Sequence, residues 1–134
     1  MKRIVLATVS AISLAAPTFA ADDTEDMFVA LFIENTLVMT KCPQYEIVPG
    51  EMGKMADKIG IDFDLTTDGV MEAFKMYSDS PYNRYKLIPS VTRSTLKHMN
   101  AHGNSLSKGV GSFCKEFGGD LQRSGFVRLK GKAS

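Results

Sequence analysis

The chain has 134 residues, of which 16 are basic and 15 acidic, so its formal net charge is +1. This length is sufficient for one domain with a modest hydrophobic core and too short for several. The sequence contains no nucleophile elbow, phosphate-binding loop or zinc signature. Because no catalytic constellation can be assembled from it, we predict a protein that is not an enzyme and uses no cofactor.

The first 20 residues have the pattern of a secretory signal peptide. Lys2 and Arg3 precede an apolar stretch over residues 4–16, and the segment ends in the small residue Ala20. The stretch is too short for a membrane-spanning helix, which needs about 20 residues. We therefore expect cleavage after this alanine, export to the periplasm, and one mature domain over residues 21–134 without a transmembrane segment.

Two cysteines, Cys42 and Cys114, are the only ones in the chain. Export places them in an oxidising compartment, and two cysteines permit one intramolecular bridge. For a loop of this length the chain-entropy estimate gives roughly 4 kcal/mol of stabilisation. A redox-active thiol is the weaker interpretation, because no Cys-x-x-Cys motif lowers a thiol pKa. An intermolecular bridge is the other alternative.

The charges are divided between the two halves of the mature chain. Asp22–Asp79 holds 13 acidic and 4 basic side chains, a net −9, whereas Ser80–Ser134 holds 2 acidic and 10 basic, a net +8. One interpretation is that the halves pack together with complementary surfaces. The other is a bipolar molecule that presents a basic face to an anionic partner.

The N-terminal half predicts three helices joined by short connectors. The first helix is apolar nearly all round over Met27–Ile33, which is typical of a central buried helix, and Pro43 stops it. Gly60 is a natural stop for the second, and a threonine caps the third. The first connector is briefly extended, and a loop with apolar anchors precedes the third helix. The predicted helices cover residues 24–42, 50–59 and 66–78.

The C-terminal half predicts two further helices and a short tail. Ser80-Pro81 is a helix-start signal that opens one or two turns. Glycines are expected to end both of the longer helices, and the tail is expected to dock as an extended segment. The predicted helices cover residues 89–102 and 105–117, with Gly103 between them. The prediction is an all-α single domain of four to five helices, with Cys42–Cys114 clamping the first helix to the last.

Two segments have a partial metal-binding pattern. Asp64–Gly69 resembles the front of an EF-hand calcium loop and Glu72 suits its ninth position, yet Lys75 occupies the twelfth, where a bidentate glutamate is needed. His98 and His102 lie four residues apart and would share one helix face, which is a geometry that can bind a metal. No third ligand is evident near either histidine.

In plan the chain is similar to small bacterial periplasmic helical proteins with a single disulfide. Two such groups are the acid-stress periplasmic chaperones and the immunity proteins that neutralise cell-wall-cutting toxins. The resemblance is one of design, so it implies a helical, exported, non-enzymatic protein and carries over no functional residue.

We therefore predict a small periplasmic accessory protein that binds a protein partner, immunity- or inhibitor-like in design. A partner with an acidic surface fits the basic half, and nucleic acid is a poor candidate in this compartment. One alternative is a stress chaperone that exposes a Met-rich apolar surface when acid neutralises the N-terminal carboxylates. The other is a metal-binding protein that uses the histidine pair or the Asp64–Glu72 loop. The predicted partner-binding side chains are Arg84, Lys86, Arg93, Lys97, Arg123 and Arg128.

Overall fold

The computed structural model describes residues 21–131, and the predicted signal peptide lies outside the described residues. The fold is mostly helical, as predicted, with one short two-stranded sheet and one disulfide. Within residues 21–131, no helix has the length and apolar character needed to cross a membrane. The elements are α1 (Ala21–Lys41), β1 (Tyr45–Ile47), α2 (Glu51–Ile59), α3 (Phe63–Tyr77), the 3₁₀ helix η1 (Arg84–Lys86), α4 (Pro89–Lys108), α5 (Val110–Phe113), the π-helical η2 (Cys114–Gly118), α6 (Gly119–Arg123) and β2 (Val127–Leu129).

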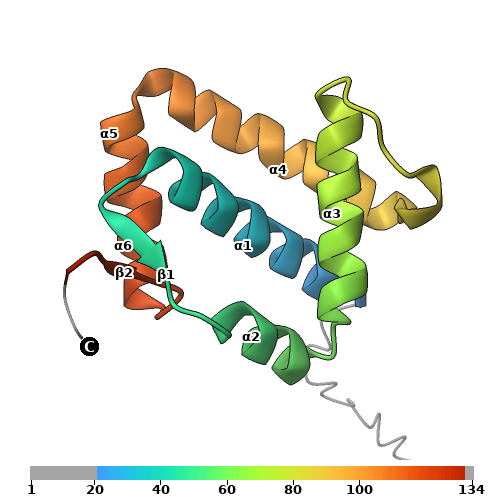
Figure 1. Ribbon diagram of the computed structural model, residues 1–134, viewed down its shortest axis with the longest axis horizontal. Helices are drawn as coiled ribbons and strands as arrows, with labels where there is room; N and C mark the ends of the chain where they lie inside the picture. The colour runs from blue at the N-terminus through green and yellow to red at the C-terminus, as the bar shows by residue number, and fades with distance from the viewer. Residues whose placement is uncertain (1–20, 132–134) are drawn as a thin grey trace, which may run out of the picture.

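Helix α1 lies at the centre of the fold. In Figure 1 it is surrounded by α4 above, α3 at one end, the α5–α6 segment at the other end and α2 below. Phe28, Val29, Ile33 and Val38 are fully buried, and they face two separate core clusters. This burial on several sides explains why the stretch Met27–Ile33 of α1 is apolar nearly all round.

Helices α1 and α4 run parallel. Asp26 near the start of α1 contacts His98 of α4, and Cys42 just after α1 is bonded to Cys114, which follows α4 and the short α5. Each pair is separated by 72 residues in the sequence. The chain therefore runs in the same direction along both helices. Their N-termini consequently lie side by side.

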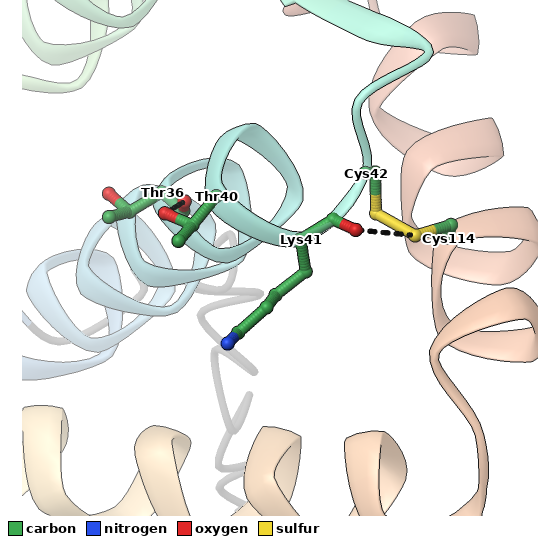
Figure 2. Close-up of a disulfide and its surroundings, with 5 residues drawn as sticks. All are labelled: Thr36, Thr40, Lys41, Cys42 and Cys114. Atoms are coloured by element: carbon green, nitrogen blue, oxygen red, sulfur yellow. Dashed lines mark hydrogen bonds between the residues drawn. A yellow bond between two sulfur atoms is a disulfide. The ribbon is translucent and has the colours of Figure 1, made fainter.

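The predicted disulfide between Cys42 and Cys114 is present and joins the end of α1 to η2, with 5.6 Å between the Cα atoms. Figure 2 shows the Lys41 carbonyl pointing at the bridge, and its oxygen lies 3.7 Å from Cys114 Sγ. One turn earlier, the Thr40 hydroxyl donates to the Thr36 carbonyl at 2.7 Å. The bridge therefore fixes a regular helix end.

The predicted extended segments exist and pair with each other. Strands β1 and β2 are antiparallel, with Tyr45 opposite Leu129 and Ile47 opposite Val127. The pairing brings the C-terminal tail against the connector after α1. The Tyr45 ring is buried and lies directly against Gly118 of η2.

Helix α3 begins earlier than predicted. Its N-cap is Asp62, whose side chain accepts a hydrogen bond from the backbone N–H of Leu65 at 2.9 Å. The carboxylate cap therefore takes the place expected for Thr66 or Thr67, and the expected loop forms the first turn of the helix. Leu65, an apolar residue of the expected loop, is exposed, and so is Tyr77 at the end of the helix.

The break between the last two predicted helices is six residues later than expected. Gly103 lies inside α4, which continues to Lys108. The chain turns at Gly109, where φ is 146°, a backbone conformation that side-chain-bearing residues rarely adopt. Gly103 keeps a helical φ, so the helix continues past it. The helical segment that follows Gly109 continues through Gly118 and Gly119 to Arg123.

Candidate functional site

The six basic residues predicted to bind a partner do not lie in one place. Arg84 and Lys86 belong to η1, and Arg93 and Lys97 belong to the first half of α4. The other two lie on α6 and β2, at the opposite end of α4 in Figure 1. The predicted set thus divides into a group of four and the pair Arg123 and Arg128.

Ion pairs join the basic C-terminal half of the chain to the acidic N-terminal half and neutralise some of their charges. Each of three basic residues from the C-terminal half meets an acidic residue from the N-terminal half. The nitrogen–oxygen distances are 3.5 Å for Lys86–Asp68, 3.1 Å for Lys97–Asp26 and 2.9 Å for Arg128–Glu46. Arg123 pairs locally with Asp120. Arg84 and Arg93 belong to the same predicted set, and neither forms an ion pair with another residue whose side chain the structure describes.

Arg84 lies in an exposed segment, Tyr82–Lys86, which we name the tyrosine loop. Buried Glu72 of α3 accepts a hydrogen bond from the Asn83 backbone N–H at 2.7 Å and another from Lys75 at 2.9 Å. The hydrogen bond from Lys75 has the larger effect in lowering the pKa of Glu72, and the hydrogen bond from Asn83 lowers it further. The carboxylate therefore remains charged and attaches the base of the loop to α3.

The tip of the tyrosine loop presents aromatic and cationic groups to solvent. Tyr85 is 83% exposed, Tyr82 is 45% exposed, and the Arg84 guanidinium lies 5.1 Å from the Tyr85 ring centroid. An Arg84 N–H also donates to the Tyr85 hydroxyl at 3.1 Å. Two surface hollows of about 450 and 550 Å³ lie against the loop, and Pro81 and Tyr82 line both. Tyrosine and arginine are enriched at binding hot spots.

Asp26 on α1 forms the second polar cluster with residues of α4. Its Oδ1 accepts a hydrogen bond from the Ser94 hydroxyl and lies 3.0 Å from His98 Nε2, while Oδ2 pairs with Lys97. Burial acts to raise the pKa of Asp26, but the hydrogen bonds from Ser94, Lys97 and His98 outweigh it and hold the pKa at about 2. The carboxylate is therefore ionised at any physiological pH.

The same three residue types occur in serine hydrolases, but the arrangement here differs. In a hydrolase the imidazole lies between the carboxylate and the serine and takes the serine proton. Here the carboxylate of Asp26 lies between Ser94 and His98 and binds both. Because no imidazole nitrogen is placed to take the proton from the serine, this cluster has the geometry of a structural anchor.

The two predicted metal-ligating histidines have separate surroundings. His98 is paired with Asp26, whereas His102 is buried with its ring centroid 4.9 Å from that of Phe117 and 6.1 Å from that of Phe113. Burial, and then the charge of His98, lower the pKa of His102. Over residues 21–131, no three His, Cys, Asp or Glu side chains are grouped as metal ligands.

The calcium-loop resemblance of Asp64–Gly69 does not correspond to a loop. These residues form the first turns of α3, and Thr66, Thr67 and Gly69 are buried against the fold. An EF-hand loop needs its oxygens to converge on one point. A helix directs them to different sides, so the segment does not have the shape of a calcium site.

One titratable group was not identified from the sequence. Glu34 of α1 faces the segment that carries Glu116 and Asp120, and burial, followed by the charges of Asp120 and Glu116, raises its pKa to about 7. Its neighbour Asn35 is buried with its side-chain oxygen lacking a hydrogen-bond partner. The available signal was a carboxylate and an amide that directly follow the apolar stretch Met27–Ile33.

Comparison with known proteins gives no relative for this chain. No protein-family model matches it, and neither a curated protein nor a solved structure does so.

Proposed function

We propose that this chain is an exported, non-enzymatic binding protein that contacts a protein partner through the tyrosine loop. The supporting observation is Arg84, an exposed cation stacked on Tyr85 in a loop that a buried carboxylate holds to α3. A held loop loses less conformational entropy on binding than a mobile one. Its chemistry suits a partner surface with a carboxylate next to an apolar side chain.

The test begins with recovery of the partner. The tagged, oxidised protein is incubated with envelope extract at neutral and at acidic pH, and the retained proteins are identified by mass spectrometry. We expect one stoichiometric partner at neutral pH. Its dissociation constant is then measured for the original chain and for Arg84→Glu, which should weaken binding at least tenfold.

Arg123→Glu is the matched control. Arg123 is also an exposed arginine, but it lies on α6, away from the tyrosine loop. Tyr85→Ala should weaken binding as well, because it removes the exposed ring and the stacking partner of Arg84. Equal affinity of the original chain and Arg84→Glu would overturn the assignment of the loop.

An acid-stress chaperone is the second candidate. The observation that favours it is the set of three ion pairs between the acidic and basic halves, at Asp26, Glu46 and Asp68. Acid would weaken the attraction between the halves, which at Asp26 requires a pH near 2, while the disulfide would limit unfolding. Many client proteins retained only at acidic pH would support this function and contradict a dedicated partner.

A further inference from the structure

A cavity of about 300 Å³ lies between the first turns of α1 and α4, separate from the tyrosine loop. Its walls carry opposite charges. Asp23, Glu25 and Asp26 line it from α1, whereas Arg93 and Lys97 line it from α4. Ser90 and Ser94 add two hydroxyl groups on the α4 side. This volume is at the lower end of the range for small-molecule sites.

Only part of this charge is used inside the fold. Asp26 is bound to Ser94 and Lys97, so these three groups satisfy one another. Among residues 23–131, whose side chains the structure describes, neither Arg93 nor Glu25 forms an ion pair with the opposite wall. Opposite charges on facing walls that do not pair with each other leave a place for a molecule that carries both signs.

The N-terminus of α4 adds positive charge to its own wall. Both N-termini lie at the cavity because α1 and α4 run parallel. The first turn of α4 has no acidic side chain, so no carboxylate of this 20-residue helix itself offsets the partial positive charge at its N-terminus. A carboxylate group is therefore favoured beside Ser90 and Arg93, while the carboxylates of Asp23 and Glu25 on the other wall attract an ammonium group.

We propose that this cavity binds a small zwitterion of the α-amino acid class. The bound carboxylate lies against Arg93 and Ser90, and the bound ammonium lies against Asp23 and Glu25. Among the residues whose side chains are described, the wall has three carboxylates and two cations, a sum of −1. This balance disfavours a phosphate or another polyanion, and the volume disfavours a ligand much larger than an amino acid.

Calorimetric and NMR titration of the oxidised protein with glycine and L-alanine tests the site. We expect saturable binding with a Kd of about 1 mM or lower. Acetate and methylammonium each carry one of the two charges, so each should bind at least tenfold more weakly. Arg93→Met and Glu25→Gln should each raise the Kd for glycine at least tenfold.

Arg123→Met serves as the control because it removes an exposed arginine far from the cavity, and it should leave the Kd unchanged. Circular dichroism will show that each variant is folded, as expected for a change at a surface position. Absence of saturable binding, or an equal Kd for glycine in the original chain and Arg93→Met, would overturn the proposal. Equal affinity for acetate and glycine would show an anion site and would also contradict it. These results do not depend on the partner of the tyrosine loop.

Discussion

Asp26 joins α1 to α4 through three side chains of one helix face. Its pKa of about 2 is below the ordinary value of 3.8, and a depressed carboxyl pKa stabilises the fold above the unfolded pKa. Asp26→Asn should therefore lower the free energy of unfolding at pH 7 by about 1 kcal/mol, a modest value because the site is partly exposed. Urea denaturation measures this difference.

The pH dependence identifies the cause. The stability contributed by the charge of Asp26 is lost as the pH falls from about 4 through 2, so the original chain and Asp26→Asn should converge over that window. Asp57→Asn, an exposed position on α2, is the control and should change little. A difference that persists undiminished at pH 2 would show that the effect is not electrostatic.

Gly118 shows how closely two segments approach each other. A Cβ atom at this position would overlap the buried Tyr45 ring, so Gly118→Ala should destabilise the fold by about 1–3 kcal/mol through displacement of the ring. Gly53→Ala on α2 is the matched control, since its Cβ would meet no atom within 4 Å. It should stabilise the helix by about 0.5–1 kcal/mol. Thermal unfolding that ranks the two variants in the reverse order would contradict this packing.

At the scale of elements, the disulfide connects α1 to η2 across most of the described chain. The paired replacement Cys42→Ser with Cys114→Ser should cost roughly 4 kcal/mol, because the unfolded chain regains the freedom of a long loop. Denaturation of the oxidised protein with and without reductant checks the same quantity without a mutation. Both routes should agree, and unchanged stability in both would show that the bridge contributes nothing.

Most of the elements follow from local sequence signals, while their boundaries depend on tertiary contacts. Pro43 and Gly60 ended α1 and α2 as predicted, because each determines a backbone conformation locally. Gly103 gave the same signal but remains helical inside α4, which packs against α1. A glycine permits a helix end without requiring one.

The candidate sites were less predictable than the helices. The sequence marked Arg84 as part of a basic half. Its stacking on Tyr85, and the hydrogen bond from Asn83 to Glu72, depend on a loop folding back on α3. The cavity between Asp23 and Arg93 was not predicted either, because it requires α1 and α4 to be parallel. Residue spacing predicts which side chains share a helix face but not which helix lies opposite.

At the scale of the whole molecule, Glu34 makes the free energy of unfolding depend on pH near neutrality. Its folded pKa of about 7 exceeds the ordinary 4.5, so its contribution is fully present below pH 4.5 and is lost as the pH rises through 7. Glu34→Gln imitates the protonated form and should raise the free energy of unfolding at pH 8 by about 2 kcal/mol. At pH 4 the variant and the original chain should be equally stable. Denaturant titration at the two pH values measures both differences.

His102 provides a control with the opposite sign. Burial against Phe113 and Phe117 lowers its pKa below 6.5, so its contribution is present above pH 6.5 and is lost as the pH falls through the lowered value. His102→Leu should therefore reduce the loss of stability on acidification, whereas Glu34→Gln should increase it, because it removes a gain. If both variants shift the pH profile in the same direction, the two groups do not titrate as their surroundings require. These opposite effects also bear on the chaperone alternative. Acid would open the fold only if the stability lost at His102 and at the ion pairs exceeds the stability gained at Glu34.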